Sequence, residues 1–143
     1  MKPALLYRIA SGLFVVTAVG HTYGFLTFKA SSPEVRGVRQ AINDVHFQMI
    51  GANSSYGDWY IGFGLLFTTH LLFSAFLAWH LGGLARKNPQ TIGAFGWSLF
   101  TVQVANLALT WMYFFPVPVT LSALAALCLG WAAGVVKVAK AEA

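Results

Sequence analysis

Long runs without a charged residue constrain this chain more than any other feature of its sequence. Residues 9–28, 59–85 and 88–136 contain no Asp, Glu, Lys or Arg. A helix that crosses about 30 Å of hydrocarbon needs about 20 mostly apolar residues, so the first two runs each have room for one crossing and the third has room for two. Only 9% of all residues are charged, against about 25% in soluble domains. The sequence therefore excludes an ordinary water-soluble domain.

Two prolines divide the longest uncharged run. Proline lacks an N–H group and disfavours helix at the residue before it, so Pro116 and Pro118 predict a turn between two helices. We expect four membrane spans at about residues 4–28, 57–82, 91–114 and 119–138, which together make a single all-α domain, an integral membrane four-helix bundle. A cleaved signal peptide is the alternative for the first span, because Lys2 precedes the apolar stretch and residues 18–20 are small.

The basic residues predict the orientation of the spans. Lys and Arg beside a span are retained in the cytoplasm. With four spans, one side holds both termini and six basic residues, namely Lys2, Arg8, Arg86, Lys87, Lys137 and Lys140. The opposite side holds three, namely Lys29, Arg36 and Arg39. Both termini are therefore expected in the cytoplasm, where the excess positive charge suits anionic lipid headgroups. The basic residues are too scattered to predict nucleic-acid binding.

The segment between the first two predicted spans carries its own helix signal. Ser32, Pro33 and Glu34 follow the order of an N-cap, a first-turn proline and an early acid. Apolar residues then recur at spacings of three and four, at Val35, Val38, Ile42, Val45 and Met49. We expect an extracytoplasmic amphipathic helix at about residues 33–49. It would either rest on lipid as a connector or cover a cavity as a lid, with residues 51–55 as a hinge.

Polar side chains inside the predicted spans are the candidates for function, because a polar group at membrane depth needs a partner in the bundle interior. At 1.5 Å per residue, four of them fall within about 8 Å of one another in depth, namely His21, His70, Gln103 and Asn106. Three further residues complete the predicted ligand-binding set, namely Thr110, Tyr23 and Trp59. We predict an interior polar pocket that binds membrane lipid or another lipophilic small molecule.

Other functions remain open at this stage. His21 and His70 could instead ligate a b-type haem, although no cofactor is required by the pattern. A histidine with amide partners could serve a membrane enzyme as a general acid or base. An accessory subunit is the remaining alternative, docked on a larger membrane complex or on a second copy through small-residue faces such as Gly20 and Gly24. No metal site is predicted, because carboxylates and thiolates are missing at matching depth.

Three segments carry a resemblance to a known group of proteins. They are residues 20–24 (GHTYG), Phe47, Met49 and Gly51, and residues 55–64 (SYGDWYIGFG). Over about the first 80 residues this pattern resembles small bacterial four-helix membrane proteins of uncharacterised function, broadly DoxX-like. The resemblance implies a bacterial inner-membrane protein and directs attention to His21 and residues 55–64. The plainer interpretation of Ser55 and Asp58 is a cap at the start of the second span.

Overall fold

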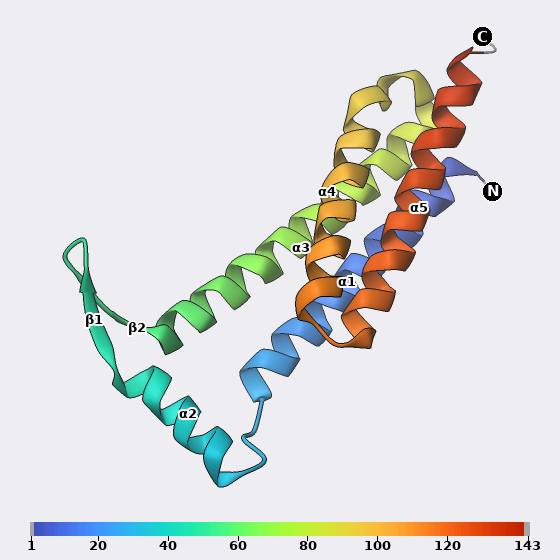
Figure 1. Ribbon diagram of the computed structural model, residues 1–143. Coiled ribbons are helices and arrows are strands. Elements are labelled where there is room, and N and C mark those ends of the chain that lie inside the picture. The colour runs from blue at the N-terminus through green and yellow to red at the C-terminus, as the bar shows by residue number, and fades with distance from the viewer. Residues whose placement is uncertain (1, 142–143) are drawn as a thin grey trace. The chain divides into compact units, whose positions relative to one another are not determined.

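A computed structural model describes residues 2–141, with every side chain in that range except those of residues 90 and 137–141. The side chains of Lys137 and Lys140, two of the predicted cytoplasmic charges, thus lie outside the described ones. Figure 1 shows the elements in chain order: α1 (Pro3–Thr27), α2 (Pro33–Asp44), β1 (His46–Met49), β2 (Ala52–Ser55), α3 (Tyr56–Lys87), the 3₁₀ turn η1 (Pro89–Thr91), α4 (Gly93–Tyr113) and α5 (Pro116–Ala141). Within the described residues, the regular secondary structure is helical apart from one short hairpin.

Three of the described helices are long and apolar enough to cross a membrane, namely α1, α3 and residues Pro116–Val136 of α5. This confirms that the chain has the character of a membrane protein. The third predicted span, α4, is long enough at 21 residues, but it is not among these three helices. A fourth crossing by α4 therefore remains a prediction.

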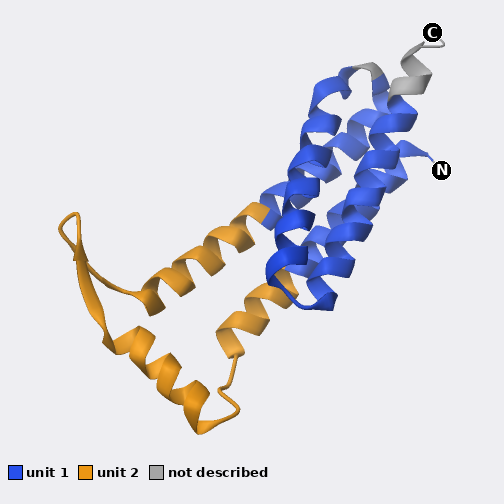
Figure 2. Cartoon of the chain, in the orientation of Figure 1, with its two compact units in different colours: residues 1–17, 71–143 blue, residues 18–70 orange. Residues whose placement is uncertain are grey.

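The chain divides into two compact units, shown in different colours in Figure 2. Unit 1 contains residues 1–17 and 71–143, and unit 2 contains residues 18–70. The first half of α1 and the second half of α3 thus belong to unit 1, together with α4 and α5. Unit 2 contains the other halves of α1 and α3, together with α2 and the hairpin.

Unit 1 has the larger buried core. α4 and α5 run side by side within it (Figure 1). Its most completely buried large side chains are Tyr7, Leu81, Ile92 and Leu129. α1 and α3 are joined there by a buried hydrogen bond of 2.8 Å, in which the Ser11 hydroxyl donates to the Ala75 carbonyl. Such interhelical hydrogen bonds and close packing replace the hydrophobic effect as the force that holds helices together in lipid.

The helix predicted at residues 33–49 is shorter than expected. The predicted cap is confirmed, because Ser32 accepts a hydrogen bond from the Val35 N–H and Pro33 opens the helix. The Ser32 hydroxyl also bonds to the Glu34 carboxylate and lowers the pKa of Glu34. The helix, however, ends at Asp44 instead of residue 49, and Val45 is extended. Its location on a membrane surface remains a prediction.

Residues 46–55 form a β-hairpin, where the sequence predicts the end of a helix and a hinge. β1 and β2 are antiparallel, with Met49 opposite Ala52. Val45 and Met49 fit a helical spacing, but Val45, Phe47 and Met49 also alternate as a strand requires. The strand is favoured over a longer helix here because the Phe47 ring packs on the Tyr56 ring, with ring centroids 5.0 Å apart.

The start of α3 confirms the predicted cap. Ser55 Oγ accepts a hydrogen bond of 3.1 Å from the Asp58 N–H, and Asp58 Oδ2 accepts one of 2.8 Å from the Ser55 N–H. This reciprocal arrangement is a capping box, which satisfies two of the four N–H groups that lack a partner at a helix start. Because Ser55 also ends β2, the box fixes the junction between the hairpin and α3.

α5 begins earlier than predicted, at Pro116 instead of residue 119. The first-turn N–H groups of a helix have no partner within the helix, so Pro116 and Pro118 both fit there without a lost hydrogen bond. The predicted break between the two helices is confirmed. α4 ends at Tyr113, one residue before the predicted end of its span, and Phe114 is extended. Only residues 114 and 115 separate the two helices.

The hairpin turn places a β-branched residue in the left-handed region. Ile50 has φ 51° and Gly51 has φ 81°, as a two-residue type I′ turn requires. A β-branched residue at positive φ costs about 1–2 kcal/mol, whereas asparagine tolerates it. Ile50→Asn is therefore expected to stabilise the hairpin by about 1 kcal/mol, measured as slower amide hydrogen exchange in β1 and β2. Met49→Asn, beside it at ordinary φ, is the control; faster exchange in Ile50→Asn would contradict the prediction.

Candidate functional site

The seven predicted ligand-binding residues fall into both compact units. Four belong to unit 2, namely His21, Tyr23, Trp59 and His70. Three belong to unit 1, namely Gln103, Asn106 and Thr110. Each set is therefore described within its own unit.

His21 makes a polar contact between α1 and α3 in unit 2. Its Nε2 lies 3.2 Å from the Gly64 carbonyl oxygen. Since a carbonyl only accepts hydrogen bonds, Nε2 carries the hydrogen and donates, which leaves Nδ1 as the acceptor nitrogen of the neutral ring. A haem ligated by His21 would thus have to bind Nδ1, or Nε2 would have to give up its hydrogen bond.

Phe67 links the two predicted histidines. The His21 ring meets it edge-on, with centroids 5.0 Å apart, and the His70 ring stacks on it with centroids 6.3 Å apart. The centroids of the two imidazole rings can therefore be no more than about 11 Å apart. Phe25 also contacts His21, at 5.0 Å. We call His21, Phe25, Phe67 and His70 the imidazole cluster.

Two threonines and a glycine, none of them among the seven predicted ligand-binding residues, complete the contact beside the imidazole cluster. Thr22 Oγ1 and Thr68 Oγ1 are 2.8 Å apart, and the Thr68 hydroxyl donates to the Gly64 carbonyl at 3.1 Å. The Gly64 oxygen thus accepts from both His21 and Thr68, using its two lone pairs. The two threonines could have been predicted from the presence of hydroxyl side chains within the uncharged runs.

Tyr23 and Trp59 have different surroundings. Tyr23 is 70% exposed. Trp59 belongs to an aromatic group at the junction of the hairpin and α3, where its ring packs edge-on against Phe47 with centroids 5.1 Å apart. In this arrangement Trp59 supports the hairpin junction.

In unit 1, Gln103 joins α4 to α5. It is buried, and its Nε2 donates to both the carbonyl oxygen of Ser122 at 3.0 Å and the Ser122 hydroxyl at 2.7 Å. The Thr110 hydroxyl donates to the Asn106 carbonyl of its own helix at 2.6 Å. Both donor hydrogens of the Gln103 amide are therefore committed to helix pairing.

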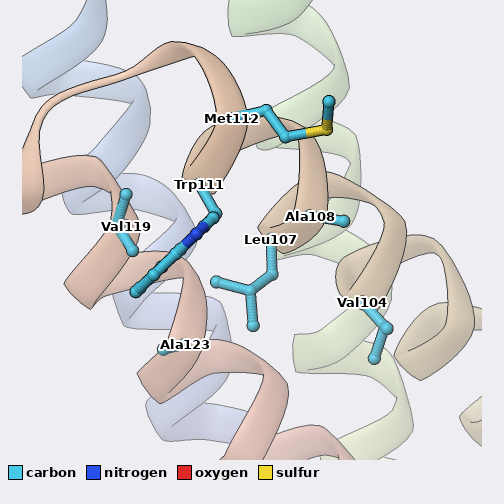
Figure 3. A pocket seen from close by; sticks show the side chains of 7 residues that line it. All are labelled: Val104, Leu107, Ala108, Trp111, Met112, Val119 and Ala123. Atoms are coloured by element: carbon cyan, nitrogen blue, oxygen red, sulfur yellow. The ribbon is translucent and has the colours of Figure 1, made fainter.

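An open apolar groove lies between α4 and α5 and contains none of the seven predicted residues. Its volume is about 500 Å³. Figure 3 shows its lining side chains, with Trp111 reaching from α4 toward α5: Val104, Leu107, Ala108, Trp111, Met112, Val119 and Ala123. The five α4 residues follow the spacing i, i+3, i+4, i+7 and i+8 of one helix face. This groove was not predicted, because its signal in the sequence is an apolar stripe, whereas the prediction of the site rests on polar groups at membrane depth.

Comparisons of the chain with protein-family models, with curated proteins and with solved structures gave no match. The DoxX-like resemblance of the first 80 residues therefore remains an expectation from the sequence.

Proposed function

We propose that this chain is an integral membrane protein that binds a lipid, or another molecule with an apolar chain, in the groove between α4 and α5. The observation that supports this function best is the groove's entirely apolar lining. Its volume of about 500 Å³ falls within the range of about 300–1,000 Å³ that small-molecule sites have. In this proposal α4 is one of four spans of a bundle in the inner membrane, both termini are cytoplasmic and α2 lies on the outer surface.

The chemistry of the lining favours an acyl chain over a helix of another protein. Helices that pair in lipid approach through small residues four apart and add polar groups that bond across the interface. The groove has bulky residues beside its two alanines, Ala108 and Ala123, and no polar side chain. Trp111 and Met112, which are 75% and 68% exposed, present flat and flexible surfaces that adapt to a disordered chain.

The interior polar pocket is a second candidate site for such a ligand, within unit 2. In it, the imidazole cluster holds the polar end of the ligand. The contact that favours it is His21, whose Nδ1 is left as a hydrogen-bond acceptor by the Nε2 bond to Gly64. A ligand hydroxyl could donate to that nitrogen.

Filling the groove tests the proposal. The protein is purified gently from membranes, and the lipids that remain bound are identified and counted by mass spectrometry. Ala108→Trp places an indole in the groove and is expected to lower occupancy by the main ligand about tenfold, equivalent to about 1.4 kcal/mol. The matched control is Ala105→Trp, the same change at an exposed position of α4 outside the lining, which should retain the ligand.

Two outcomes would count against the proposal. Equal retention by the wild type, Ala108→Trp and Ala105→Trp would show that lipid is held elsewhere. Loss of a stoichiometric polypeptide instead of a lipid from Ala108→Trp would make the groove a docking site and the protein an accessory subunit. His21→Phe keeps the aromatic packing and removes the nitrogens, so a change in ligand identity in this variant alone would support the polar pocket.

A further inference from the structure

Arg8 is a charged residue within a helix that can cross a membrane. It lies in α1, five residues after the helix begins at Pro3. Its guanidinium carbon is 4.8 Å from the centre of the Trp79 ring on α3. Both residues belong to unit 1. A cation over an indole face gains about 0.5–1 kcal/mol at exposed sites, but it keeps its charge and its N–H donors.

The described part of unit 1 offers no anion to Arg8. Residues 2–17 and 71–141 contain no Asp or Glu, and Glu142 lies outside the described residues. The buried Nε–H of Arg8 also has no hydrogen-bond partner among the described atoms. A guanidinium has five N–H donors and stays charged in proteins, so leaving it without an anion at membrane depth is costly.

Contacts on both sides of Arg8 fix its helix against α3. One turn before Arg8, Ala4 lies close to Gly82 of α3. A Cβ built on Gly82 would lie 3.1 Å from the Ala4 carbonyl oxygen and 3.3 Å from Arg8 Cγ. Less than one turn later, Ser11 bonds to Ala75. The aliphatic part of the Arg8 side chain thus lies on the Gly82 backbone. The position of the guanidinium is therefore set by the packing of α1 on α3. Arg86 and Lys87 follow in the last turn of α3.

Exposed apolar side chains flank Arg8 along its own helix. Leu5 and Ile9 are 50% and 39% exposed, and Trp79 itself is 55% exposed. A free phosphate ion gains nothing from such flanks, whereas the acyl chains of a phospholipid would cover them. Tryptophan also prefers the depth of the lipid headgroups, and the planar fork of arginine matches two phosphate oxygens.

We propose that Arg8 and Trp79 form a binding site for the phosphate of an anionic phospholipid. Two N–H groups of the guanidinium bond to phosphate oxygens, the Trp79 ring supports the guanidinium from one face, and Leu5 and Ile9 contact the acyl chains. This site involves none of the residues that line the groove between α4 and α5, so either proposal can fail without the other.

Lipid selection around the protein tests the site. The full chain is reconstituted in nanodiscs with equal parts of phosphatidylcholine and phosphatidylglycerol, and the lipids that stay bound after release are counted by native mass spectrometry. We expect the wild type to retain phosphatidylglycerol preferentially and Arg8→Gln to lower that preference about fivefold. Arg8→Lys should fall between the two, because lysine keeps the charge but lacks the fork.

Arg86→Gln is the matched control, since it removes the same charge from an exposed position at the end of α3. Exposed charges are screened at about 1 M salt, where the Debye length is about 3 Å. The Arg8→Gln effect should therefore persist in high salt and in added inorganic phosphate, while any Arg86→Gln effect should disappear. Equal losses in the two variants that both vanish in salt would overturn the proposal in favour of a diffuse surface charge.

Trp79→Leu tests the same phospholipid site if Arg8→Gln fails to fold. Leucine preserves an apolar side chain at this position and leaves the arginine charge in place. Loss of the indole face should lower the preference for phosphatidylglycerol about two- to fivefold. An unchanged preference in Trp79→Leu would show that Trp79 takes no part in the site.

Discussion

Replacing Gly96 with alanine is expected to lower the free energy of unfolding by about 1–3 kcal/mol, the cost of overpacking a filled core. An added Cβ would lie 2.4 Å from the Tyr7 hydroxyl oxygen and 2.9 Å from Ile92 Cγ2. Tyr7 is fully buried at 0% exposure, so its rigid ring has no open space into which it can move. The change is measured by an equilibrium SDS titration in mixed micelles.

A second substitution identifies the atom responsible. The Tyr7 hydroxyl is buried and makes no hydrogen bond within the described residues, so Tyr7→Phe by itself should leave stability unchanged or raise it by about 1–3 kcal/mol. In the Gly96→Ala background, Tyr7→Phe should recover part of the loss, since the Tyr7 hydroxyl oxygen is gone while Ile92 Cγ2 remains. Gly12→Ala is the control, because no atom lies within 4 Å of its added Cβ. Simple additivity of Gly96→Ala and Tyr7→Phe would contradict the steric explanation.

Gly57→Ala is expected to destabilise unit 2 by about 1–3 kcal/mol. Its Cβ would lie 1.9 Å from Asn43 Oδ1 and 3.3 Å from the Asn43 Cα atom. The side-chain oxygen can rotate away, but the backbone atom can move only if the end of α2 shifts from the start of α3. Amide hydrogen exchange across residues 33–44 should therefore become faster, alongside the loss in the SDS titration.

Two further substitutions test whether the contact with Asn43 causes the effect of Gly57→Ala. Asn43→Ala removes the nearest oxygen but not the Cα atom, so it should relieve Gly57→Ala only in part. Gly62→Ala lies in the same helix with no atom within 4 Å and should not speed exchange in α2. If Gly62→Ala loosened α2 as much as Gly57→Ala did, the contact at Asn43 would not be the cause.

The helices could be predicted from the sequence where one physical requirement dominates. Uncharged runs long enough to cross hydrocarbon located α1, α3 and α5, because insertion depends on summed apolarity and is insensitive to the order of residues. The Ser32 and Ser55 caps could be predicted because capping depends on residues only three apart.

The hairpin could not be predicted because two requirements were met by the same residues. Val45 and Met49 satisfy a helical and a strand periodicity, and the turn has Ile50 where asparagine or glycine would have signalled a type I′ turn. The contact between Phe47 and Tyr56, which favours the strand, joins residues nine apart and has no periodic signature.

The candidate site was predicted by depth alone, and depth does not specify which way a side chain faces. His21 and His70 do share a neighbour, Phe67, as their similar depth suggested. Gln103 lies at a similar predicted depth but donates to Ser122 on α5. The rotation of each helix about its axis decides such contacts, and it depends on packing across the whole interface.

The bond between Gln103 and Ser122 bears on how the protein is made. An amide that enters hydrocarbon without a partner costs several kcal/mol, and in the four-span arrangement that we propose, α4 alone would carry Gln103 into the bilayer in that state. α5 supplies both acceptors and follows after only two residues, Phe114 and Phe115. A nascent chain would therefore hold α4 at the translocation channel until α5 has been synthesised, and the two helices would leave it for lipid together.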